Sequence, residues 1–158
     1  MQLLLLRHGI AEDGHPDASR PLSPAGRQRT QAVLQRLVRL DLQCDPIVSS
    51  PLLRARQTAE LAVAAGLAPA LQLAAPLAPG GNARPWLLQA LATGLGAGSQ
   101  RLGLVGHEPD LSLLAAGLIG APAGSLQLKK AGVIVLLWDP AAAVARLQWL
   151  ASPRLLLL

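Results

Sequence analysis

Near its start the chain reads Leu3-Leu4-Leu5-Leu6-Arg7-His8-Gly9, an apolar run that ends on an arginine, a histidine and a glycine. The leucines predict a buried strand over residues 2–6. An imidazole can attack phosphorus and carry the group covalently, and an adjacent guanidinium offers a planar fork to phosphoryl oxygens. Gly9 lacks a side chain, so the backbone there can approach a ligand closely. The stretch therefore indicates phosphoryl chemistry at the end of a strand.

Strand-like and helix-like segments alternate along the rest of the chain. Further strands are predicted over residues 45–49, 70–73, 101–106, 131–138 and 145–151. Helices are predicted from Ser23-Pro24 onward and over residues 50–65, 84–95 and 110–118, with serine as N-cap and proline in the first turn of the first two. This alternation predicts an α/β protein with one domain, residues 1–158, built as a three-layer α/β/α sandwich around a mostly parallel central sheet.

Three groups with phosphate-binding chemistry follow three of these strands. His8, Ser50-Pro51 with Arg54, and His107 each lie just past the carboxyl end of a predicted strand. Ligands of open α/β sheets bind at that edge, so we expect the three groups to share one pocket. If Ser50 caps its helix, Arg54 lies near the first turn, where free N–H groups and the helix dipole favour an anion.

Composition excludes several other classes of function. Hydrophobic residues make up 51% of the chain and charged residues 15%, which argues against disorder. Cys44 is the only cysteine, so an internal disulfide is excluded. The net charge is +5, but the arginines are scattered, the lysines are only Lys129 and Lys130, and Phe and Tyr are absent. We therefore expect no nucleic-acid partner.

The termini and the polar loop give expectations about location and metals. No apolar run approaches the roughly 20 residues of a transmembrane helix, and the first residues lack the basic segment of a signal peptide. We expect a cytoplasmic protein with no membrane partner. Asp13, His15 and Asp17 share a polar loop that could hold a metal, but such residues are more often solvated. We expect no metal and no cofactor.

Four segments together resemble the histidine phosphatase superfamily, whose fold is phosphoglycerate mutase-like. They are residues 7–9, residues 21–26, residues 49–59 with the pattern Ser-Pro-x-x-Arg-Ala-x-Gln-Thr-Ala, and Gly106-His107-Glu108-Pro109. Their order and spacing, with the short chain, are similar to the SixA-type phosphohistidine phosphatase branch. The resemblance covers nearly the whole chain, and the block at 49–59 is its most specific part.

The resemblance implies a set of site residues. His8 is expected to be the nucleophile that becomes phosphorylated, with Arg7, Arg54 and His107 holding the phosphoryl oxygens. Nearby cations should disfavour a protonated His8 and so keep its lone pair available. Arg20 matches an additional phosphate-binding arginine of the SixA branch. The expected substrate-binding residues are Arg20, Gly9, Ser50 and Glu108.

One departure from the family bears on the substrate. Phosphomonoesterase members carry a glutamate general acid after the third strand, whereas residues 77–82 here contain no carboxylate. An alkoxide leaving group needs a proton donor, but phosphohistidine releases imidazole and can manage without one; Glu108 and Glu12 stay open as donors. We expect a monomeric, metal-independent phosphohistidine phosphatase acting on a phosphorylated protein, for example a histidine-phosphotransfer domain in signal transduction. The alternatives are a phosphatase of small phosphomonoesters and a catalytically silent phosphoprotein-binding module.

Overall fold

The leucine run forms the centre of the fold. In the computed structural model, which describes residues 1–158, Leu3 to Leu6 are fully buried in strand β1 (Gln2–Arg7). β1 pairs in parallel with β4 and antiparallel with β5, within a six-stranded sheet of order β3-β2-β4-β1-β5-β6. The remaining elements are α1 (Pro24–Arg39), β2 (Ile47–Ser49), α2 (Leu53–Ala64), β3 (Leu71–Leu73), α3 (Ala83–Ala92), β4 (Arg101–Gly106), α4 (Asp110–Ile119), β5 (Val133–Asp139), β6 (Val144–Ala151) and α5 (Pro153–Leu156), with short 3₁₀ turns η1 (Asp17–Ser19) and η2 (Ala75–Leu77).

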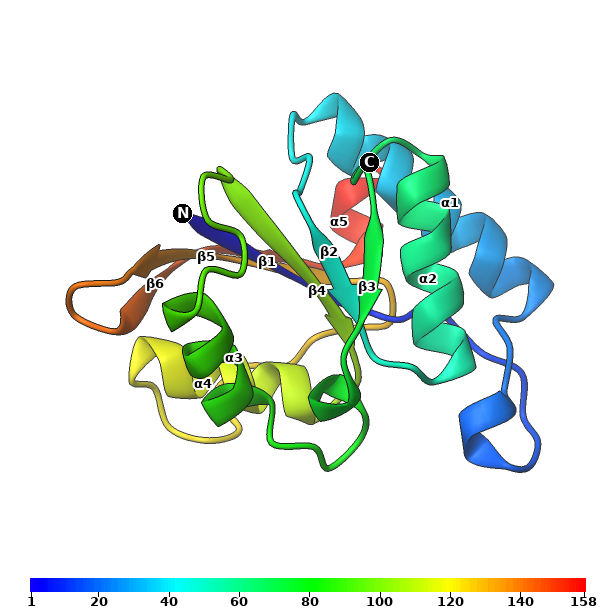
Figure 1. Ribbon diagram of the computed structural model, residues 1–158. Coiled ribbons are helices and arrows are strands. Elements are labelled where there is room, and N and C mark those ends of the chain that lie inside the picture. Colours follow the sequence, from blue (N-terminus) through cyan, green and yellow to red (C-terminus); the bar gives the residue numbers. More distant parts are fainter.

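Helices cover both faces of this sheet. Figure 1 shows α1, α2 and α5 on one side and α3 and α4 on the other. Successive residues of β1 point to opposite faces, so Leu4 and Leu6 pack beneath α1 and α2 while Leu3 and Leu5 pack beneath α3 and α4. The predicted three-layer sandwich with a mostly parallel sheet is confirmed; the antiparallel part is the β5–β6 hairpin at one edge.

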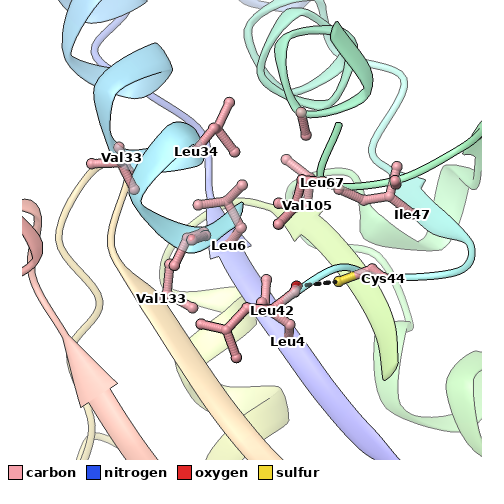
Figure 2. Close-up of a cluster of buried hydrophobic side chains, with 14 of the residues drawn as sticks. Leu4, Leu6, Val33, Leu34, Leu42, Cys44, Ile47, Leu67, Val105 and Val133 are labelled. Carbon is pink, nitrogen blue, oxygen red and sulfur yellow. Dashed lines mark hydrogen bonds between the residues drawn. The ribbon is translucent and has the colours of Figure 1, made fainter. Parts of the chain in front are cut away.

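The core under α1 and α2 is built from aliphatic side chains. Figure 2 shows Leu6 of β1 near Leu34 of α1 and Leu4 beside Leu42, with Cys44 at the rim of the cluster. The thiol of Cys44 contacts the carbonyl oxygen of Leu42 at 3.6 Å. Burial raises the pKa of the Cys44 thiol to about 12, so at neutral pH the group is protonated and is a poor nucleophile.

Most elements fall within a few residues of their predicted positions, and two differences are informative. The helix predicted from residue 50 begins only at Leu53, because the Ser50 hydroxyl accepts a local hydrogen bond from the backbone N–H of Leu52 (3.2 Å) instead of capping the helix. The terminal helix α5 was not predicted. None of the helices is both long enough and apolar enough to cross a membrane.

Candidate active site

Three neighbouring parallel strands end at the same edge of the sheet. Arg7 of β1 is in register with Gly106 of β4, and Ser49 of β2 with Val105 of β4. His8, Ser50 and His107, the next residues of the three strands, therefore emerge side by side. All three are buried, and the ring centroids of His8 and His107 lie 5.0 Å apart. The expected meeting of these residues is thus present in the structure.

The hydrogen bonds of His8 fix which ring nitrogen carries its proton. Nδ1 lies 2.6 Å from the carbonyl oxygen of Gly9, which can only accept, so Nδ1 is the donor in this pair. Nε2 accepts a hydrogen bond from Nε of Arg54 at 3.3 Å, which requires a lone pair on Nε2. The neutral tautomer with its lone pair on Nε2 is therefore the one that these contacts select.

Burial and neighbouring cations keep both imidazoles neutral. Desolvation lowers the pKa of His8 to about 3, and His107, Arg54 and Arg7 contribute in the same direction against the opposing effect of the Gly9 carbonyl. Desolvation and then Arg54 lower the pKa of His107 to about 4. At neutral pH, Nε2 of His8 is thus an unprotonated nitrogen surrounded by positive charge, a suitable arrangement for attack on an anionic phosphoryl group.

Arg54 is held between His8 and the η1 turn. Its side chain is buried, and while Nε faces His8, Nη1 donates to the backbone oxygen of Asp17 (2.9 Å) and Nη2 to the Asp17 carboxylate (3.1 Å). Because Asp17 takes the two terminal nitrogens, the guanidinium is fixed with its Nε–H edge toward Nε2 of His8. Figure 1 shows η1 beside the amino-terminal end of α2, where Arg54 lies.

The rest of the block at 49–59 ties α2 to the loops of the site. The backbone N–H of Gly9 donates to Oγ1 of Thr58 (3.2 Å), and that hydroxyl donates to the carbonyl oxygen of Arg54 (2.8 Å). Oε1 of Gln57 accepts a hydrogen bond from the backbone N–H of Leu22 (2.8 Å). Gln57 and Thr58 therefore fix the loops after β1 and after η1 relative to Arg54, which explains why these residue types stand at this spacing.

Arg20 reaches the site through Asp17. Its Nη1 lies 2.9 Å from the Asp17 carboxylate, and its Nε donates to the backbone oxygen of Glu12 (2.7 Å). Hydrogen bonds from Arg20 and then Arg54 hold the pKa of Asp17 below its ordinary value. The sequence offers Asp17 as a candidate metal ligand or a solvated loop carboxylate and does not predict its contact with Arg54; its position three residues before Arg20 is the available signal.

Two buried nitrogens of the site have no partner within the protein. Arg7 donates through Nη1 to the carbonyl oxygen of Leu128 (2.8 Å), while its Nε is unpaired. Nε2 of His107 lies 2.8 Å from the hydroxyl of Ser50, while its Nδ1 is unpaired. Buried polar groups are nearly always hydrogen-bonded, and a buried group without a partner destabilises the folded protein by about 1–3 kcal/mol. Two such nitrogens on residues next to His8 and Ser50 at the sheet edge are suited to a ligand that brings acceptor oxygens.

Gly9, Ser50 and Glu108 occupy structural positions around His8 and His107. A Cβ on Gly9 would lie 2.1 Å from Oγ1 of Thr30 in α1, so this glycine permits close packing of the loop on the helix. Ser50 orients His107. The Glu108 carboxylate accepts hydrogen bonds from the backbone N–H and hydroxyl of Ser112 and from the backbone N–H of Leu128. Its oxygens hold α4 and the loop that binds Arg7.

The neutral state of buried His8 predicts a pH dependence of stability. In the unfolded chain an ordinary histidine takes up a proton near pH 6.5, whereas folded His8 stays neutral down to about pH 3. The unfolded state therefore binds the extra proton, and the free energy of unfolding falls as the pH drops from 6.5 toward 3. Urea titrations should show that the free energy of unfolding falls less between pH 7 and pH 4.5 for His8→Asn than for the unchanged chain. The difference should be on the order of 1 kcal/mol per pH unit below pH 6.5.

Exposed His15 supplies the matched control for this measurement. His15→Asn should lose as much stability between the two pH values as the unchanged chain. Equal losses in all three proteins would show that His8 does not remain neutral in the fold.

Comparison with known proteins agrees with this geometry. Residues 3–74 match the Histidine phosphatase superfamily (branch 1). An uncharacterized protein of Picosynechococcus sp. is 45% identical over 140 residues, covering 86% of this chain and 84% of that protein. A structure of the protein histidine phosphatase SixA complexed with tungstate has a TM-score of 0.89 at 23% identity, covering 99% of both chains. An alpha-ribazole phosphatase from Shigella flexneri has a TM-score of 0.73 at 21% identity, covering 97% of both chains. Fold, site geometry and sequence together place the chain in the histidine phosphatase superfamily, branch 1.

Proposed function

We propose that this protein is a phosphatase that hydrolyses phosphohistidine on a partner protein through a phosphohistidine intermediate on His8. The observation that carries the proposal is the environment of His8: Nδ1 donates to Gly9, and the Nε2 lone pair faces the Nε–H edge of Arg54. A nucleophilic nitrogen and a phosphate-binding guanidinium thus meet within 3.3 Å. The SixA structure that shares this fold contains tungstate, a tetrahedral oxyanion, and this supports an oxyanion site here.

In the first step, Nε2 of His8 attacks the phosphorus of the substrate. The P–N bond of the substrate breaks, its electron pair stays on the departing imidazole nitrogen, and solvent supplies the proton that this nitrogen takes up. His8 keeps its proton on Nδ1, so the phosphorylated ring is cationic, and the Gly9 carbonyl at 2.6 Å stabilises that charge. In the second step, water attacks phosphorus, orthophosphate leaves, and neutral His8 is restored.

The surrounding donors stabilise the phosphoryl group during both steps. Its charge is spread over three equatorial oxygens, so catalysis depends on positioned donors more than on covalent assistance. The Nε–H edge of Arg54, Nε of Arg7 and the ring of His107 supply these donors. The unpaired nitrogens of Arg7 and His107 favour this assignment, because the phosphoryl oxygens give each an acceptor.

The carboxylates near the site favour phosphohistidine over a phosphomonoester. Two arginines hold the pKa of Asp17 low, so it is ionised at neutral pH and has no proton to give. The oxygens of Glu108 are engaged by Ser112 and Leu128, and Glu12 is exposed. A site without a poised acid suits an imidazole leaving group better than an alkoxide.

A direct substrate comparison tests the proposal. A histidine-phosphotransfer protein labelled with ³²P and a panel of sugar and acyl phosphates are supplied separately at pH 8, where phosphohistidine is stable. We expect rapid loss of label from the protein and slow release of phosphate from the panel. Rapid turnover of the panel with intact phosphohistidine would support a small-molecule phosphatase instead. Retention of phosphoprotein without any labelled enzyme would support a silent binding module.

Asp17→Asn tests whether this residue positions Arg54. Asparagine keeps the size of the side chain but removes the charge that holds two arginines, so we expect kcat to fall about 10-fold as the Arg54 fork loses its orientation. The melting temperature should change little, because Asp17 is exposed and η1 contains no buried residue. The control is Asp13→Asn in the same loop, whose carboxylate lies 3.9 Å from Arg20. Equal kcat values for Asp17→Asn and Asp13→Asn would show that Asp17 does not position Arg54 for the reaction.

A further inference from the structure

A cleft of about 400 Å³ next to the candidate active site is lined by four cationic side chains. Arg29 comes from α1, Lys129 and Lys130 from the loop before β5, and Arg154 from α5. No acidic residue lines the cleft, and none of the four cations forms an ion pair within the protein. Residues that are scattered along the sequence therefore gather into one patch of positive charge.

Two of the residues that line the cleft, Ile10 and Lys130, lie close to the backbone of His8. Ile10, which lines it, follows His8 by two residues. On the other side, Lys130 precedes Ala131, whose backbone N–H lies 3.1 Å from the carbonyl oxygens of both Arg7 and His8. Burial, followed by repulsion from Arg7, Arg20 and Arg54, lowers the pKa of Lys130 against the opposing effect of the Asp13 carboxylate. A ligand in the cleft would therefore lie beside a phosphoryl group bound at His8.

The charge and the residue types that line the cleft indicate which class of ligand it binds. Four cations without carboxylates favour an anionic partner. A small phosphomonoester would use the donors at His8 and would not extend to Arg29 and Arg154. A nucleic acid would gain from aromatic platforms, and none of the three tryptophans lines the cleft. An acidic segment of a protein fits both the charge and the position.

We propose that this cleft docks an acidic segment of the phosphorylated partner protein and so presents its phosphohistidine to His8. The inference rests on the proposed function and extends it from the phosphoryl group to the protein that carries it. Docking of this kind acts mainly on association with the protein substrate and leaves the chemical step unchanged.

The test reverses three charges of the cleft outside the catalytic set. In the triple variant R29E/K129E/R154E, all three replaced residues are exposed, so the fold should be retained. We expect KM for an acidic ³²P-labelled histidine-phosphotransfer protein to rise about 10-fold at 50 mM salt, with kcat unchanged and turnover of free phosphohistidine unchanged. The difference from the unchanged protein should shrink at 500 mM salt, where the Debye length falls to a few ångströms.

The matched control is R36E/R39E/R146E, which makes the same change in net charge at three exposed positions outside the cleft. The proposal is overturned if the two triple variants show the same KM for the phosphoprotein, or if the cleft variant loses free phosphohistidine turnover to the same extent. It is also overturned if a single-stranded oligonucleotide binds the unchanged protein and not the cleft variant while phosphoprotein turnover is equal. Failure of the proposed function looks different: the unchanged protein itself would leave the phosphoprotein intact.

Discussion

Replacing His8 with asparagine is expected to abolish the phosphoenzyme and to lower kcat/KM for phosphohistidine by about 10⁴-fold or more, the scale of loss seen when a covalent nucleophile is removed. Asparagine is suited to the test because its amide can still donate toward the Gly9 carbonyl, which His8 contacts at 2.6 Å. The variant therefore removes the nucleophilic nitrogen with the least disturbance of the buried loop. The measurement is acid-labile, base-stable ³²P on the protein after a rapid quench, together with single-turnover rates.

The other two histidines supply the controls for this experiment. Exposed His15→Asn should accumulate label and turn over substrate as the unchanged chain does. His107→Asn should still form some phosphoenzyme, more slowly, because it removes a donor and leaves the nucleophile in place. Peptide mapping then locates the label. Label on His107 or His15, or undiminished label on His8→Asn, would rule out His8 as the nucleophile.

The fold could be predicted from the sequence because its central elements carry unambiguous local signals. The four leucines of β1 and residues 102–106 of β4 are buried on both faces, and such continuous apolar runs are typical of strands inside a parallel sheet. In α1, Ser23 does cap the helix, accepting a hydrogen bond from the backbone N–H of Gly26 at 3.0 Å. Where local preference and tertiary packing agree, the prediction and the structure coincide.

The Ser-Pro dipeptide shows where local reasoning fails. It occurs three times, at Ser23, Ser50 and Ser152, and the first and third serines cap helices. Ser50 does not, because it lies at the sheet edge, where its hydroxyl meets both the backbone N–H of Leu52 and the ring of His107. The same dipeptide thus has a different role when a long-range contact competes for the hydroxyl, and this competition is invisible in one sequence.

The positions of charged groups were the least predictable part of the site. The sequence indicated that His8, Arg54 and His107 follow strand ends, and parallel pairing makes their meeting a consequence of topology. The contact of Asp17 with Arg54 depends instead on the path of an irregular loop, and the gathering of Arg29, Lys129 and Arg154 depends on how α1 and α5 pack. Neither contact leaves a periodic pattern in the sequence. Scattered arginines in the sequence therefore say little about their distribution on the folded surface.

Replacing Arg54 with alanine is expected to lower kcat about 10²–10³-fold, the usual effect of losing one transition-state donor. The guanidinium is buried and its Nε lies 3.3 Å from Nε2 of His8, the nitrogen proposed to attack, so its contact with the transferring oxygens should be strongest in the transition state. An interaction of that kind lowers kcat and kcat/KM together. Both constants should be measured on the phosphoprotein and on free phosphohistidine, because the loss should be the same for the two substrates.

Two further variants distinguish the specific contacts of the Arg54 guanidinium from the effect of a positive charge alone. Arg54→Lys keeps the positive charge, but a single ammonium cannot face His8 and also bind the backbone oxygen and the carboxylate of Asp17. We therefore expect kcat to fall at least about 10-fold. Arg56→Ala, two positions along α2, removes an exposed ion pair with Glu60 at 3.2 Å and should change kcat less than about 2-fold. If Arg54→Lys retained full activity, or if Arg56→Ala lost as much as Arg54→Ala, the guanidinium of Arg54 would not be the group that stabilises the phosphoryl transfer.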